Sequence, residues 1–294
     1  MRGSQNVRIL IDGKPSGLTG LGDGEGLRVL QGNLIESVEI ITNPSAKYDA
    51  EGEAGIINII LKKDGGKGLN GAVEVSTGYP HNHGLGANLS YRKGNINLFG
   101  SYSLNYKKHN GSGYYYQEIY NTDSTLISEM NRQHQRGGLG NTGRLGMDFF
   151  IKEKNIITLS GMYRNVFGDN KADLVYHDFD SEGNVLFSTD RNETEDEDKQ
   201  NIEVDLRFKM EFKKKDQEWI VDAKWHDSND RESSNITEAI PENDTSDIFQ
   251  RVENVEDEVN WLVQTDYVHP FGKGGKIETG AKFTDRTIKN NYAA

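Results

Sequence analysis

The sequence predicts an all-β membrane protein, a partial antiparallel β-barrel whose strands cross a lipid bilayer. Two observations support this: strict alternation of apolar and polar residues, and alternation of short and long connections. In residues 201–212, "NIEVDLRFKMEF", every even position from 202 to 212 is apolar and every odd position from 203 to 211 is charged. Because successive side chains of a strand point to opposite faces, this segment presents one apolar and one charged face.

Alternation of this kind continues through most of the chain from residue 69 onward. We count about nine strands of roughly 8–12 residues, the length that a tilted transmembrane strand needs. The apolar faces carry no charge, and their aromatic residues resemble the girdles at the two boundaries of a membrane barrel. These aromatic residues are Tyr79, Tyr91, Tyr106, Tyr163, Trp219, Trp225, Trp261 and Tyr267.

The connections between these strands are of two kinds. Short basic clusters such as "RKGN" (92–95) and "KKKDQE" (213–218) alternate with the long stretches 107–135, 165–199 and 227–257, of which the last two are strongly acidic. Bacterial outer-membrane barrels have short periplasmic turns and longer extracellular loops. The basic clusters are therefore predicted to be periplasmic turns and the long stretches extracellular loops, which could include extended strands. The alternative is a soluble antiparallel sandwich with one solvated face, which predicts no such rhythm.

Composition excludes several classes of protein. Hydrophobic residues make up 34% of the 294, which is low for a conventional core, and the net charge of −12 argues against nucleic-acid binding. There is no cysteine, so neither a disulfide framework nor thiolate chemistry is expected. No run of eighteen apolar residues suits a transmembrane helix, and the first residues lack the apolar region of a signal peptide.

The first sixty residues have a different character. "NVRILIDGKP", "IESVEII" and "GIINIILKK" are predicted strands, and "LRVLQGN" (27–33) is a predicted short helix. The segments "RGSQNVRILIDGKP" and "IESVEIITNPSAKYDAEGEAGIINIILKK" closely resemble the second half of the plug domain of TonB-dependent outer-membrane receptors of the Bacteroidetes type. We therefore expect part of a small α+β plug domain in residues 1–63 and the first part of the barrel in residues 64–294.

This resemblance implies a barrel of about twenty-two strands filled by a plug. It also implies uptake of an unidentified ligand across the outer membrane, driven by the TonB complex, with membrane lipid and lipopolysaccharide as further partners and no cofactor. The signal peptide, the TonB box, the first half of the plug and the final aromatic strand of such receptors are not found, so a receptor fragment is expected. The alternative function is an adhesin-like surface protein, which has no reason to carry a plug segment.

The charged face of the barrel strands supplies the candidate functional residues. Buried charges need partners, and the segment "AKYDAEGE" (46–53) of the plug could supply them; the simpler interpretation is that these charges only solvate the lumen. The candidates for lining the lumen and contacting the plug are Glu203, Asp205, Arg207, Lys209, Asp222, Lys224, Glu278 and Lys282.

Three short motifs mimic chemical sites. "GLGDGEG" (20–26) lacks the Lys-Ser/Thr of a phosphate loop, so a flexible plug loop is preferred. "HNH" (81–83) is predicted to be a solvated loop rather than a metal site, because no third ligand is near. "DFDSEGN" (178–184) lacks the last ligand of a calcium loop and is predicted to be a hairpin tip. No catalytic, metal or cofactor site is expected, and the protein is not expected to be an enzyme.

Overall fold

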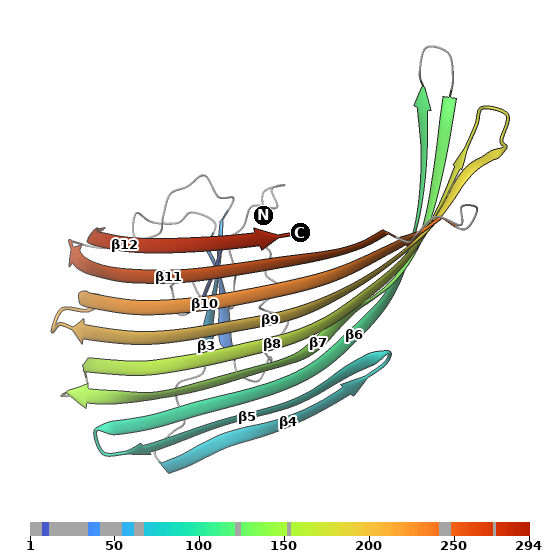
Figure 1. The fold of residues 1–294 in the computed structure, drawn as a ribbon. Coiled ribbons are helices and arrows are strands. Elements are labelled where there is room, and N and C mark those ends of the chain that lie inside the picture. Colours follow the sequence, from blue (N-terminus) through green and yellow to red (C-terminus); the bar gives the residue numbers. More distant parts are fainter. Residues whose placement is uncertain are drawn as a thin grey trace.

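The computed structural model describes residues 8–11, 35–41, 55–61, 68–120, 125–151, 154–240, 248–272 and 275–294. These residues form two β-sheets, one of three strands and one of nine (Figure 1). Within these ranges no helix is long and apolar enough to cross a membrane.

The smaller sheet contains the three strands predicted near the N-terminus. They are β1 (Arg8–Ile11), β2 (Ile35–Ile41) and β3 (Ile56–Leu61), in the order β1-β3-β2. β1 runs parallel to β3, and β2 runs antiparallel to it. The predicted helix at 27–33, the segment at 46–53 and the glycine-rich stretch at 20–26 lie outside the described residues.

The larger sheet is entirely antiparallel, and each strand pairs with its neighbours in the sequence, which confirms the predicted partial barrel of nine strands. Its strands are β4 (Gly68–Gly78), β5 (His81–Lys93), β6 (Ile96–Tyr120), β7 (Thr125–Ile151), β8 (Asn155–Phe179), β9 (Val185–Glu211), β10 (Glu218–Ala239), β11 (Ile248–Phe271) and β12 (Gly275–Ala293).

The predicted strand lengths were wrong for seven of these strands. β6 to β12 contain 19 to 27 residues each, and most of the stretches 107–135, 165–199 and 227–257 is strand rather than loop. The pairing of β6 with β7 runs in one register from Ile96↔Phe149 to Tyr120↔Thr125. The backbone ladder continues beyond the apolar alternation because main-chain hydrogen bonds do not require an apolar face.

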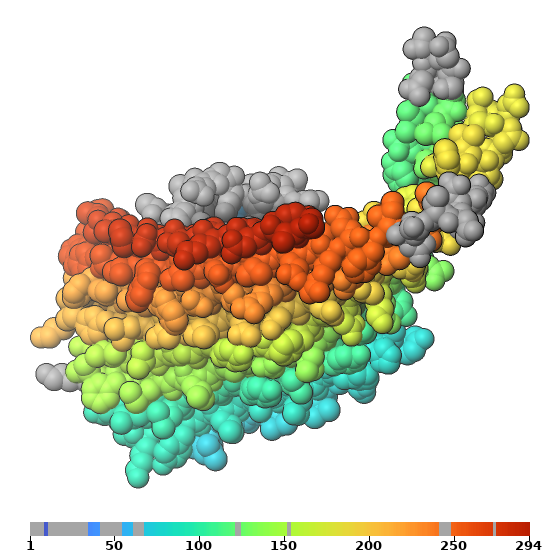
Figure 2. Space-filling view, viewed as in Figure 1, coloured from blue at the N-terminus to red at the C-terminus, as the bar shows by residue number. Residues whose placement is uncertain are grey.

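The larger sheet is curved, and the smaller sheet lies within its curve (Figure 1). The two sheets meet through an apolar contact between Ile59 of β3 and Met162 of β8, against which Ile9, Ile35 and Ile57 pack. In the space-filling view the nine strands form a continuous wall, and hairpins project beyond one of its ends (Figure 2). The small sheet is therefore anchored to the inner face of the wall.

The burial of this wall is the reverse of that of a soluble protein. Its buried residues are mainly polar or charged, whereas its exposed residues include a long series of large apolar side chains. A soluble sandwich would bury that apolar face, and exposed apolar patches of this extent mark a surface that contacts lipid or a partner. The exposed apolar residues include Leu69, Val73, Val75, Leu89, Leu98, Leu145, Leu159, Val204, Leu206, Trp261, Val263 and Phe283.

Candidate functional site

A chain of hydrogen bonds crosses the inner face of the wall. Asn97 of β6 donates from its Nδ2 to Asp148 Oδ2 of β7 at 3.0 Å, and Thr158 of β8 donates from its Oγ1 to Asp148 Oδ1 at 2.7 Å. These three residues oppose one another in the register and all are buried. Both carboxylate oxygens of Asp148 thus accept a hydrogen bond, which offsets the cost of burying the group.

An ion pair continues this row across the next two strands. Arg207 of β9 opposes both Thr158 and Asp222 of β10. Its Nε lies 2.7 Å from Asp222 Oδ1 and its Nη2 lies 3.2 Å from Oδ2, so the guanidinium engages the carboxylate with two hydrogen bonds. Such a bidentate pair is geometrically specific as well as strong.

A second charged cluster lies beside the contact between the two sheets. Glu203 of β9 opposes Met162 on one side and His226 on the other. The Nζ of Lys224 lies 2.8 Å from Glu203 Oε2, and Nδ1 of His226 lies 3.6 Å from Glu203 Oε1. Glu203 is 4% and Lys224 8% exposed, so this pair is almost fully removed from water. Removing either partner would leave a buried charge poorly compensated.

The structure thus brings four of the eight predicted residues together as two ion pairs, the buried pair Glu203–Lys224 and the partly buried pair Arg207–Asp222. The other four lie elsewhere on the charged side of the strands. Lys209 pairs with Glu211 at 2.9 Å and with Glu218 at 3.4 Å, and Glu278 pairs with Lys276 at 2.5 Å. Asp205 and Lys282 also have interaction partners. That these residues line a lumen and contact a plug stays a prediction.

Sequence reasoning did not select Asn97, Asp148, Thr158 or His226 as candidates. The signal that could have found Asn97 and Asp148 is the two-residue period, because each lies between two apolar residues in the sequence. The most highly charged segments supplied the candidates, whereas uncharged Asn and Thr side chains complete the hydrogen-bonded row.

The predicted loop at 81–83 is strand instead. β4 and β5 pair up to Gly78↔Asn82, so only Tyr79 and Pro80 form the turn and His81 already begins β5. The His83 ring stacks on Tyr106 with a centroid separation of 6.4 Å, and His83 Nδ1 lies 2.8 Å from Thr77 Oγ1. No cluster of three potential metal-ligating side chains occurs in the described part of the chain.

The hairpin tip predicted at 178–184 is confirmed. Asp180 accepts hydrogen bonds from the backbone N–H groups of Glu182 at 2.9 Å and Asn184 at 2.8 Å, and from the Asn184 side chain at 2.8 Å. Gly183 adopts a φ of 84°, which a glycine accommodates without strain. Hydrogen bonds to the charged form hold the pKa of Asp180 below its usual value, so this carboxylate caps a turn.

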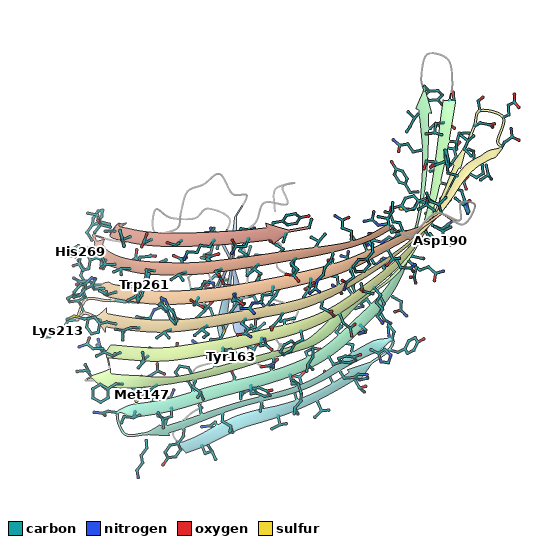
Figure 3. All side chains as sticks on the ribbon, viewed as in Figure 1. Met147, Tyr163, Asp190, Lys213, Trp261 and His269 are labelled. Carbon is teal, nitrogen blue, oxygen red and sulfur yellow. The ribbon has the colours of Figure 1, made fainter. Side chains whose placement is uncertain are left out.

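The outer face carries aromatic pairs near the short turns. Phe208 meets Trp219 edge to face at 5.9 Å, and Phe212 meets Tyr267 in the same manner at 6.0 Å. In Figure 3, Lys213 and His269 lie at this end of the wall, and Trp261 lies further along the strands. Asp190 lies at the opposite end, where the hairpins project. The aromatic pairs therefore lie near the short turns, whereas the acidic residue Asp190 lies at the end with the projecting hairpins.

Comparison with known proteins agrees with this geometry. Residues 210–294 match the family described as outer membrane protein beta-barrel family. FpvA, the ferripyoverdine receptor of the outer membrane of Pseudomonas aeruginosa, is similar to the chain in a complex with a heterologous pyoverdine, with a TM-score of 0.50 and 11% identity. That alignment covers 97% of this chain and 46% of FpvA. The fold is that of part of an outer-membrane β-barrel.

Two further solved structures resemble this chain less closely. The ferric citrate transporter FecA aligns with a TM-score of 0.47 and 12% identity over 99% of this chain and 49% of its own. The siderophore receptor PiuA of Acinetobacter baumannii aligns with a TM-score of 0.36 and 14% identity over 98% of this chain and 54% of its own. The chain therefore spans about half the length of these receptors. No curated protein matches it.

Proposed function

We propose that the chain is part of a TonB-dependent outer-membrane receptor of the Bacteroidetes type, which takes up an unidentified ligand. Residues 1–63 form the second half of the plug and residues 64–294 the first strands of the barrel. The observation that carries the proposal is the reversed burial of the large sheet: apolar side chains are exposed on one face, and the other face is polar, buried and in contact with a smaller sheet.

The lipid of the outer membrane covers the exposed apolar face in this proposal. In hydrocarbon every backbone polar group must be paired. The ladder of β4 to β12 pairs the strands with one another, and further strands of the complete barrel would pair with the outer edges of β4 and β12. Lipopolysaccharide surrounds the projecting hairpins, and the basic turns lie in the periplasm. The adhesin-like alternative gives no role to the small sheet held inside the curve.

The ion pairs of the inner face have a structural role in this receptor. Glu203–Lys224 and Arg207–Asp222 fix the inner side of the wall next to the contact with the small sheet. During uptake the TonB complex moves the plug, and the paired charges keep the wall rigid while it does so. Their role is positional, and they do not select the ligand.

Labelling in intact cells tests the orientation. Glu182→Cys places a thiol at the exposed tip of the β8–β9 hairpin, and Lys214→Cys places one in the exposed turn between β9 and β10. A membrane-impermeant maleimide should label the first in intact cells and the second only after the outer membrane is permeabilised. The reverse pattern would show that the orientation is inverted, and labelling of neither in membranes would contradict outer-membrane assembly.

Uptake in the native host tests the transport. The gene for the entire receptor is deleted, and cells are supplied with radiolabelled ferric siderophores, haem, oligopeptides and glycans. We expect uptake of one class to fall in the deletion strain and in a strain without TonB, and to return on complementation. If uptake returns equally without TonB, the energised mechanism is wrong; if no class is affected, the receptor function is wrong.

A further inference from the structure

One face of the projecting β6–β7–β8 sheet concentrates tyrosine rings and carboxylates. Tyr116, Glu129 and His177 oppose one another across the three strands. We call this surface the tyrosine face. Its members are Tyr114, Tyr116, Glu118, Tyr120, Glu129 and His177, which share one side because strand residues alternate. The three rings at 114, 116 and 120 are 61%, 47% and 74% exposed, so they are available to a partner.

The hydrogen bonds of this face hold negative charge between the rings. The hydroxyl of Tyr116 donates to Glu118 Oε1 at 2.6 Å, and the hydroxyl of Tyr120 donates to Glu118 Oε2. These hydrogen bonds lower the pKa of Glu118, and the one to Tyr116 is the main cause that raises the pKa of that phenol to about 12. The carboxylate therefore stays ionised and the phenol stays neutral at physiological pH.

The charge on this side of the sheet is of one sign. Along the outward positions of β6 from 112 to 120, of β7 from 125 to 133 and of β8 from 173 to 179, there are three carboxylates and no lysine or arginine. Those carboxylates are Glu118, Glu129 and Asp173. A neutral partner would have to desolvate them without compensation, and an anionic partner would be repelled.

We propose that the tyrosine face docks a basic polypeptide segment. Lysine or arginine side chains of the partner lie over the tyrosine rings and pair with Glu118 and Glu129. Aromatic rings attract cations through the negative potential of their faces, and tyrosines provide large rigid contact area at low entropic cost. The hairpin projects past the wall, so an extended segment can reach it (Figure 1). This role is separate from uptake through the barrel.

Binding to the purified chain in detergent tests the proposal. The probe is a fluorescent peptide of alternating Lys and Gly, compared with a matched peptide of alternating Gln and Gly. We expect the Lys peptide to bind at least about tenfold more tightly. Each exposed ring contributes about two- to fivefold, so the triple variant Tyr114→Leu, Tyr116→Leu, Tyr120→Leu should weaken binding by at least about tenfold.

Matched variants separate the face from general electrostatic attraction. Glu118→Gln with Glu129→Gln should weaken binding by about tenfold, whereas Glu182→Gln with Asp196→Asn removes the same charge elsewhere and should change it less than about twofold. Tyr115→Leu, on the opposite side of β6, serves as the control for loss of a ring. Equal effects of face and control variants, equal binding of the Gln peptide, or no effect of the triple variant would overturn the proposal.

Footprinting of the unchanged protein guards against misfolded variants. Hydroxyl-radical oxidation, read by mass spectrometry, should be reduced by the Lys peptide at Tyr114, Tyr116 and Tyr120 and unchanged at Tyr115. Protection at all four or at none would refute docking on this face. Because these measurements use purified protein, their failure leaves uptake untouched, and failure of uptake leaves them untouched.

Discussion

The two ends of the large sheet differ in length, charge and construction. At one end β9 and β10 are joined by the short turn 212–217, which carries Lys213, Lys214 and Lys215. At the other end the strands run on as projecting hairpins (Figures 1 and 3). There, residues 165–199 hold eleven carboxylates and three basic side chains, and residues 227–257 hold ten and two. The same sheet therefore ends in a short basic turn on one side and in long acidic hairpins on the other.

The outward positions of β9 show where the character changes. Ile202, Val204 and Leu206 are apolar and exposed, whereas Asp198 and Asp196 occupy the same side of the same strand further along. The backbone pairing does not change between them. The boundary between the apolar wall and the acidic extension is therefore set by side chains alone, and substitutions on either side of it should have unequal effects.

Breaking an ion pair should show the largest contrast. Glu203→Gln leaves Lys224 in the buried wall with a poorer partner, and we expect a loss of roughly 3–5 kcal/mol in the free energy of unfolding. Glu232→Gln in the extension breaks its 3.1 Å pair with Lys199, whose side chains are 37% and 30% exposed, and should cost less than about 1 kcal/mol. Urea unfolding in detergent or lipid measures both.

A compensating variant checks the cause. Glu203→Gln combined with Lys224→Met removes both charges and should recover a large part of the loss, because the uncompensated lysine is gone. If the double variant is as unstable as Glu203→Gln alone, the loss does not come from the buried charge. Equal losses in the free energy of unfolding for the wall and extension pairs would show that the two ends provide the same environment.

An arginine placed on the outer face should show a smaller contrast. Leu206→Arg puts a charge on the apolar wall and should cost roughly 2–4 kcal/mol if the position lies near the midplane. Asp196→Arg puts the same side chain on the same side of β9 within the acidic extension, where the cost should be near zero. Heat-modifiable migration of the assembled protein reports both, and similar behaviour would place the two residues in one environment.

The sequence determined the wall better than its extensions. Alternation of apolar and polar residues predicted about nine strands, because one side of the wall strands is largely apolar. The extensions carry charge on both sides, as Asp196 and Glu197 illustrate, so the same criterion did not separate loop from extended strand there. Their strand structure depends on register between two chain segments, which is a property of pairs and is not visible in either segment alone.

The candidate site was predictable in kind but only partly in membership. The two-residue period places Glu203, Arg207, Asp222 and Lys224 on one side of the sheet. The register of β9 against β10 places Arg207 opposite Asp222 and Asp205 opposite Lys224. Lys224 nevertheless pairs with Glu203, the diagonal neighbour, and no sequence pattern distinguishes these two choices.

The junction between the two halves of β7 offers a further test. Pairing of β7 with β8 is interrupted at Arg136 and Gly137, and Gly137 has a φ of 136°. A Cβ at Gly138 would lie 1.9 Å from the backbone oxygen of Phe167, so Gly138→Ala forces the two backbones apart. We expect a loss of roughly 1–3 kcal/mol, confined to the extension, measured by hydrogen exchange. Gly113→Ala, where a Cβ meets no atom within 4 Å, is the control.

The smallest expected effect is a pH dependence of the acidic extension. Burial raises the pKa of Glu197, with a hydrogen bond to Glu195 adding to it, and burial also raises the pKa of Asp230. A carboxyl group with a raised pKa in the folded state binds its proton more tightly than in the unfolded state, so stability is gained as the pH falls toward the ordinary value of about 4.3 and lost as it rises.

The extension should therefore be slightly more resistant to trypsin near pH 5.5 than near pH 7.5. Cleavage at Lys199 relative to cleavage in the 213–215 turn corrects for the pH dependence of the protease itself. Glu197→Gln should flatten this ratio by removing one titrating group, and a ratio that rises on acidification would contradict the raised pKa values of these two carboxyl groups.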